Sequence, residues 1–257
     1  MKTRYELAIN GTQLHELSDR IMILDISHGA ARTEIVSNNV PNRNGQRVVG
    51  RYVRLLSVTV TFEIHTPDIE ERQRVMDSVV SLASEAEYIT TNDKPGKVLY
   101  AKCDTPPAID SVLKWTKPIK MTFTAYDVPY WQSEYPSGVE IEGRSGEDTM
   151  YVDGNGALAR VSVSVQNATQ GTLNDVTVGV GDTKIALTGL SLYPGEELEI
   201  GHENGLLYIR GAGGSKMKCR TAESSDELLI KTGTQQTVFV QAGGNVRASF
   251  SARGLFL

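Results

Sequence analysis

The stretch LLSVTVTFEI, Leu55 to Ile64, decides the fold of the N-terminal half because its residues alternate in polarity from Leu56 onward. Every second position from Leu56 to Ile64 carries a large apolar side chain, and serine, threonine or glutamate fills the positions between them. Successive side chains of a strand point to opposite faces, so this period of two predicts a long strand with one buried face.

The segment after this strand predicts the one clear helix of the chain. Thr66 can cap its first turn, Pro67 suits the first helical position, and the acids that follow face the positive end of the helix dipole. The apolar positions fall on one stripe: Ile69, Met76, Val79, Val80 and Ala83. A second alternating run, Ile119 to Ala125, predicts another strand. We therefore expect an α+β sheet with a helix on one face.

The pattern changes near residue 135, where short apolar runs punctuated by glycine replace the longer segments. Many short strands at this spacing are typical of an antiparallel β-sandwich. We expect a turn at each glycine cluster, including Ala242 to Asn245, between these strands: Met150–Val152, Val161–Val165, Val176–Val180, Lys184–Leu187, Leu198–Ile200, Leu206–Ile209, Leu228–Ile230, Thr237–Val240 and Val246–Phe250. The sequence thus predicts a mainly β chain of two domains, residues 1–134 (α+β) and residues 135–257 (β-sandwich).

Charge, hydropathy and cysteine content exclude several classes of function. The formal net charge is −5, whereas a general nucleic-acid binder shows a basic surplus. No run approaches the roughly 20 apolar residues of a membrane helix, and the N-terminus lacks the apolar core of a signal peptide, so we expect a protein kept in a cytosol-like compartment. Cys103 and Cys219 have no second ligand at metal-binding spacing, which favours buried structural thiols over a zinc or redox site.

The residues that carry enzyme chemistry form no recognisable pattern. None of the four histidines, His15, His28, His65 and His202, has a second histidine at the spacing of a zinc protease. Gly211 to Lys216 has the wrong spacing for a phosphate loop. Acids such as Glu140, Glu142, Glu147, Asp148, Glu196, Glu197 and Glu199 have no context that fixes two of them as a glycosidase pair. We expect no enzyme, no cofactor and no metal.

Three polar or aromatic segments are candidates for binding or for turns. Asp93-Lys-Pro-Gly96 precedes an apolar strand and not a helix, so it predicts a type II turn and not an anion-binding loop. The polar stretch from Ser37 to Arg54 contains four arginines and is either a solvated loop or an arm that touches a partner. Tyr130, Trp131 and Tyr135 either pack over the edge of the first domain, which we favour, or stack on sugars or partner proteins.

In this order and spacing, the segments resemble the distal tail proteins of long-tailed, non-contractile bacteriophages. The runs Asp93 to Ala101 and Met121 to Tyr130 are the most specific pieces of the N-terminal half. The C-terminal half is similar to the galectin-like β-sandwich of that family at Leu190–Ile200, Asn204–Ile209 and Val238–Phe250. Gly201-His202 departs from the family, which often has Asp after the isoleucine that precedes them.

The resemblance implies a structural virion protein that takes part in host attachment. Such proteins form homo-oligomeric rings, commonly hexamers, that join the major tail tube protein to tail-tip or baseplate proteins. The N-terminal domains surround a channel through which DNA passes without specific nucleic-acid binding, and the C-terminal domains face outward. The implied location is the tail tip of the virion, after synthesis in the cytoplasm of the bacterial host.

A ring needs edge strands that pair across subunits and an arm that reaches a neighbour. We hypothesise that the basic loop Asn42 to Arg51 and the strand Leu56 to Ile64 supply them, through Arg43, Arg47, Arg51, Leu56, Val58 and Val60. Two other functions stay open. One is a carbohydrate-binding module for host cell-wall polysaccharide that uses Trp131, Tyr135, Tyr193 or Tyr208; the other is a hydrolase.

Overall fold

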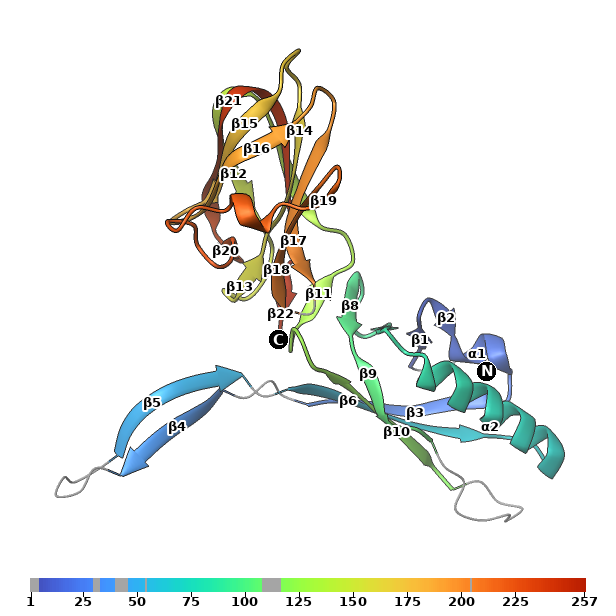
Figure 1. Cartoon of the computed structure of the whole chain (residues 1–257). Coiled ribbons are helices and arrows are strands. Elements are labelled where there is room, and N and C mark those ends of the chain that lie inside the picture. The colour runs from blue at the N-terminus through green and yellow to red at the C-terminus, as the bar shows by residue number, and fades with distance from the viewer. Residues whose placement is uncertain (1–4, 30–32, 40–45, 54, 108–116, 204) are drawn as a thin grey trace. The chain divides into compact units, whose positions relative to one another are not determined.

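The computed structural model describes residues 5–29, 33–39, 46–53, 55–107, 117–203 and 205–257 (Figure 1). The chain divides into two compact units, Met1–Gln132 together with Leu257, and Ser133–Phe256. Strands dominate both units, which confirms the mainly β fold class.

A four-stranded antiparallel sheet forms the centre of the first unit, in the order β3-β6-β10-β9. The predicted strand Leu56–Ile64 is β6, and its buried and half-buried side chains alternate along its whole length. The predicted strand Ile119–Ala125 is β10, which pairs with β6 from Ile119↔Phe62 to Ala125↔Leu56. The other two strands are β3 (Ile21–His28) and β9 (Lys102–Thr105). Both strands that the sequence predicts are therefore confirmed.

Helix α2 (Ile69–Ser84) follows β6 as predicted, but it begins later than the sequence suggests. The N-cap is Asp68, whose carboxylate accepts a hydrogen bond from the amide of Glu70 at 2.9 Å. Thr66 instead accepts from the amide of Asp68 at 3.2 Å, so it braces the approach to the helix. A charged cap at the positive end of the dipole explains why Asp68 replaces Thr66. Ile69 is 45% exposed and lies off the buried stripe, which comprises Arg72, Val75, Met76, Val79 and Ala83.

Shorter elements complete the first unit: β1 (Leu7–Ile9), β2 (Thr12–Gln13), α1 (Leu14–Leu17), β7 (Tyr88–Thr91) and β8 (Lys97–Tyr100). Strand β11 (Trp131–Ser133) includes Trp131 and Gln132 of the first unit and Ser133 of the second. Strand β1 pairs with β2 and β7, and β7 pairs with β8. The turn between β7 and β8 is closed by a hydrogen bond from the amide of Lys97 to the carbonyl of Lys94 at 3.2 Å. Gly96 has a φ of 68°, which a type II turn requires at its third position. The predicted turn is confirmed.

Two further strands, β4 (Thr33–Asn39) and β5 (Gln46–Val53), form an antiparallel hairpin where the sequence suggested a polar loop. The loop interpretation is wrong for these residues, because β-branched side chains such as Ile35, Val36 and Val48 favour a strand. The two strands form a sheet of their own (Figure 1). We call residues 33–39 and 46–53 the hairpin.

The second unit consists of antiparallel strands, as a β-sandwich requires: β12 (Ser137–Tyr151), β13 (Leu158–Arg160), β14 (Ser162–Asn167), β15 (Leu173–Val180), β16 (Thr183–Leu192), β17 (Glu197–Glu203), β18 (Leu206–Gly211), β19 (Gly214–Ser215), β20 (Leu229–Lys231), β21 (Gln235–Ala252) and β22 (Leu255–Phe256), with one 3-10 turn, η1 (Met217–Cys219). Strand β12 pairs with β21 over nearly all of both strands. On the side of β21 that faces away from β12, its first half pairs with β15 and its second half pairs with β14. The two long strands therefore contribute to both layers.

Strand β21 corrects one expectation, because it contains both predicted strands Thr237–Val240 and Val246–Phe250 without a turn between them. The glycines at this point serve close approach, not chain reversal. A Cβ on Gly244 would lie 2.4 Å from Cγ2 of Thr169. The ladder between β12 and β21 shifts register between Gly143 and Ser145, which marks the bend that lets one pair of strands serve two layers.

Candidate assembly surfaces

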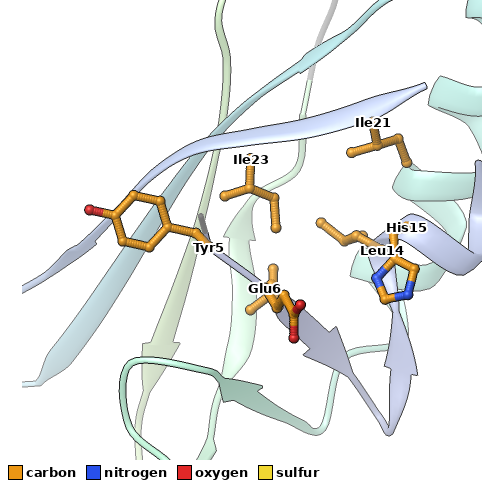
Figure 2. A pocket seen from close by; sticks show the side chains of 7 residues that line it. Tyr5, Glu6, Leu14, His15, Ile21 and Ile23 are labelled. Carbon is orange, nitrogen blue, oxygen red and sulfur yellow. The ribbon is translucent and has the colours of Figure 1, made fainter. Parts of the chain in front are cut away.

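A hollow in the first unit is too small for a ligand. The small cavity in Figure 2 has a volume of about 10 Å³, which is room for about one water molecule. Leu14, Ile21 and Ile23 point toward one another around it, whereas the ring of Tyr5 points away. Within the described ranges, no group of three or more His, Cys, Asp or Glu residues is arranged to hold a metal ion. Among the helices that the structure describes, none is long and apolar enough to cross a membrane.

Exposed surface positions are occupied by His15, His65 and the acids of β12. His65 Nε2 lies 3.1 Å from the Glu63 carboxylate on β6, and His15 lies in the short helix α1. Glu142 on β12 accepts a hydrogen bond from Arg247 Nε at 2.6 Å. This hydrogen bond, then the charge of Glu142 and a smaller attraction from Glu140, raise the pKa of the Arg247 guanidinium above its usual value. The contact between Glu142 and Arg247 is a cross-strand ion pair on a solvated sheet face.

Both cysteines are free and half-exposed, so the expectation of buried structural thiols is wrong. Cys103 lies on the edge strand β9, where one side has no neighbouring strand in the described sheet to cover it. Partial burial, followed by the nearby Asp104 carboxylate, raises the pKa of its thiol. A thiol with a raised pKa carries little thiolate and is a poor nucleophile.

The β7–β8 turn supports a polar cluster at the end of β3. His28 Nε2 lies 2.5 Å from Asp93 Oδ2, and the His28 ring meets the edge of Trp131 at a centroid distance of 5.5 Å. The Lys94 ammonium lies 5.8 Å from the centre of the same indole. Trp131 is fully buried, as the packing interpretation predicts. Through Asp93 and Lys94, the β7–β8 turn therefore contacts both His28 at the end of β3 and the indole of Trp131.

Asp93 remains a carboxylate in this cluster to lower pH than a free aspartate. Its partial burial alone would raise its pKa, but the nearby Thr91 hydroxyl, the hydrogen bond with His28 and the charge of His28 outweigh that effect. The net result is a pKa below the usual value of 3.8. Interactions that favour the charged form of a group are part of the folded state's stability.

The face of the central sheet opposite its apolar side is lined with hydroxyl groups. Ser57 and Thr124 are joined across β6 and β10 at 3.0 Å between their hydroxyl oxygens, and Thr59 and Thr122 at 3.2 Å. We call Ser57, Thr59, Thr61, Thr122 and Thr124 the hydroxyl face. Its members are neutral, but charged residues flank them: Asp25 and Lys120 lie opposite Thr61, and Lys102 lies opposite Thr124.

The hairpin exposes several apolar side chains. Ile35 is 53% exposed, Val36 42%, Val48 51% and Val49 61%. An isolated two-stranded ribbon is marginally stable in water, so such a surface favours contact with a partner. Arg47 and Arg51 lie on β5, whereas Arg43 lies outside the described residues. Contacts of these three arginines with a neighbouring subunit remain a proposal.

Strand β6 is an interior strand, which corrects the other half of the ring-contact hypothesis. It is paired on one side with β3 and on the other with β10, so it offers no free edge to a neighbour. Leu56, Val58 and Val60 are 2%, 0% and 0% exposed and belong to the core. Alternation revealed which face of the strand is buried, but not that both of its edges are paired.

The fold of the chain is similar to the folds of a hub protein and a baseplate protein of phage tails. A scan against protein-family models finds no match, and a search of curated proteins finds none either. The likeness emerges only when the folds themselves are compared, because sequence identity with the solved structures is low.

The structure of the SPP1 Dit (gp 19.1) protein matches with a TM-score of 0.72 at 11% identity, over 97% of this chain and 98% of that one. That protein is described as a paradigm of the hub adsorption apparatus of phages that infect Gram-positive bacteria. A chain of the phage p2 baseplate, in its activated conformation with strontium, matches with a TM-score of 0.55 at 11% identity, over 97% of both chains. The fold expected from the resemblance to distal tail proteins is confirmed.

Proposed function

We propose that this chain is a distal tail protein, a structural component of a phage virion that forms a ring at the end of the tail tube. The observation that carries this proposal is the match with SPP1 Dit, which spans both units and not one common domain. The ring, which we propose to be a hexamer, connects the tail tube protein to the tail-tip or baseplate proteins. It acts by assembly and not by catalysis.

The hairpin is the part of the first unit best suited to join subunits. Its four exposed apolar residues would each contribute about 1 kcal/mol if a neighbour covered them, given the free energy of burying such side chains and their present partial burial. Its arginines add charge that an acidic neighbour attracts. The chain as a whole has a formal net charge of −5, so a copy of itself offers acidic surface. This makes the hairpin the subunit-joining arm.

The hydroxyl face suits a surface past which DNA moves. Lysine and arginine that neutralise phosphates release counterions and bind DNA tightly, which would retard its passage. The groups that Ser57, Thr59 and Thr122 offer are neutral hydroxyls. Each hydroxyl already takes part in a cross-strand hydrogen bond, and the three residues are half-buried. We place this face toward the channel of the ring.

Particle imaging of the purified chain tests the proposal. We expect rings with a central hole in negative-stain electron microscopy, and a light-scattering mass that is a discrete multiple of 28.1 kDa. A chain that stays monomeric across its soluble concentration range, without added tail proteins, would contradict ring formation by the chain alone. A ring that forms only with a tail tube protein present would support the connector and move ring assembly to the complex.

The carbohydrate-binding alternative keeps only part of its support. Trp131 is buried, and the Tyr208 ring is covered by the Arg210 guanidinium at 4.3 Å. Tyr135 and Tyr193 remain 77% and 59% exposed. A monomer whose tyrosine fluorescence responds to cell-wall polysaccharide, and no longer responds after Tyr193→Ala, would favour that alternative over the ring.

A further inference from the structure

The second unit covers its sheet edges unequally. The outer edge of β16 is occupied by the segment after η1: the amide of Ser225 donates to the carbonyl of Lys184 at 2.7 Å, and that of Thr221 to the carbonyl of Ala186 at 2.9 Å. The outer edge of β18 is occupied by β19, which pairs with it at Arg210↔Ser215. Both strands are thereby protected from pairing with another chain.

Strand β12 is different, because it pairs with β21 alone. On its other side, no described residue forms a backbone hydrogen bond with it. Because β12 contributes to both layers of the sandwich, its open edge runs along both layers. Alternate backbone N–H and C=O groups of an edge strand point away from its partner, and such a row is a template for an added strand.

The C-terminal half of β12 carries two features that hinder pairing. The register shifts between Gly143 and Ser145, and Asp148 lies on the same strand face as the buried Met150 while remaining exposed. A bulge and an inward-facing charge are both known means of protecting an edge. The N-terminal half has neither, and Ser137–Gly143 keeps unbroken register with Ala252–Val246. The available edge is therefore these seven residues.

The charges near this edge indicate what would occupy it. Strand β12 carries four acids, Glu140, Glu142, Glu147 and Asp148, against one arginine, Arg144. Two copies of this edge would place carboxylates opposite one another, and like charges directly opposite destabilise a strand pair. A basic strand would meet carboxylates instead. We propose that the edge Ser137–Gly143 binds an extended, lysine- or arginine-bearing segment of another protein by strand addition.

The test uses hydrogen–deuterium exchange of the full chain, measured by mass spectrometry. The probe is a blocked heptapeptide of alternating lysine and valine, matched to the length of the open edge. We expect it to slow exchange within Ser137–Gly143, by about threefold at a peptide concentration of about twice its dissociation constant. The same peptide with glutamate in place of lysine should give less protection, and a fully N-methylated version should give none.

Charge reversal provides the matched variants. Glu140→Lys with Glu142→Lys should abolish protection by the lysine peptide and create protection by the glutamate peptide. Glu197→Lys with Glu199→Lys makes the same change on β17, which is separated from β12 by β21 and β14. At about 14 Å of strand spacing, this control lies beyond the screening length of about 8 Å and should behave like the unchanged chain.

Three results would overturn the proposal: no slowing with either peptide, equal slowing with the N-methylated peptide, or protection of Ser137–Gly143 that rises with the concentration of the chain alone. The last would assign the edge to a second copy. Ring imaging of the Glu140→Lys/Glu142→Lys chain separates this proposal from the ring itself. We expect its rings to be unchanged, because the hairpin lies in the other unit.

Discussion

Single residues in this chain serve geometry more often than chemistry. Gly201, which departs from the family pattern, pairs with Tyr208 across β17 and β18. A Cβ at that position would lie 2.7 Å from the tyrosine hydroxyl, so glycine makes room for the ring. Asn167 is buried and donates to the carbonyls of Gly171 and Leu192 at 2.9 and 2.8 Å, which fixes the loop between β14 and β15. Neither contact has a signal in the local sequence.

Asp93 gives a prediction at this scale. Its folded pKa is lowered, so its contribution to stability is complete above the unfolded value of 3.8 and is lost as pH falls through the folded pKa. We expect Asp93→Asn to lower the free energy of unfolding by about 0.5–1 kcal/mol near neutral pH, a small value because the pair is partly solvated.

Urea unfolding at about pH 7 and about pH 3 measures this difference, which should shrink at the lower pH. Asp19→Asn is the control, since the Asp19 side chain is 89% exposed and should change stability little at either pH. A difference between Asp93→Asn and the unchanged chain that is equal at both pH values would contradict the linkage.

At the scale of elements, regular alternation of polarity predicted strands correctly, whereas segments without this alternation were assigned wrongly. The period of two in Leu56–Ile64 and in Ile119–Ala125 led directly to β6 and β10, because one face of each strand is buried. The hairpin was missed because its apolar residues Ile35-Val36 and Val48-Val49 are adjacent and exposed, and therefore do not form the alternating pattern of a strand with one buried face. Strand β21 was divided in two because glycine marks close approach as well as turns.

The hairpin gives the prediction at this scale. Replacing Arg43, Arg47 and Arg51 together by Glu should weaken ring formation, because an acidic arm is repelled by an acidic neighbour. Sedimentation velocity should show a shift from ring to monomer, with unchanged far-ultraviolet circular dichroism.

The control makes the same charge change at Arg20, Arg74 and Arg144, which are exposed and lie outside the hairpin. A triple hairpin variant that still migrates as a full ring would remove the arginines from the subunit contact. Retention of the ring by the control excludes net charge alone as the cause of any loss.

At the scale of the whole molecule, the two units have separate cores. Met76 on α2 is 3% exposed within the first unit, and Asn167 is 1% exposed within the second. Units with their own cores need not unfold together, and a single transition is not expected for a chain of this kind.

We therefore expect calorimetry to resolve two transitions, each sensitive to its own variant. Met76→Ala removes a buried side chain, which costs about 2–5 kcal/mol, and should lower one transition. Asn167→Ala leaves two carbonyls without their hydrogen-bond donor, which costs about 1–3 kcal/mol or more, and should lower the other transition. Asn174→Ala, an exposed position on β15, should shift neither transition. One transition that shifts with both buried-site variants would show that the units unfold as one.

The sequence by itself determined the fold class, the main strands and helix of the first unit and the type II turn, because each depends on short-range periodicity or turn chemistry. The resemblance to distal tail proteins rests instead on motifs in their order and spacing. Tertiary structure alone decided which strands are edges, since pairing joins residues far apart in the chain. It made β6 interior, left β12 open and turned an expected loop into the hairpin. The residues available for assembly follow from those pairings, and local sequence does not encode them.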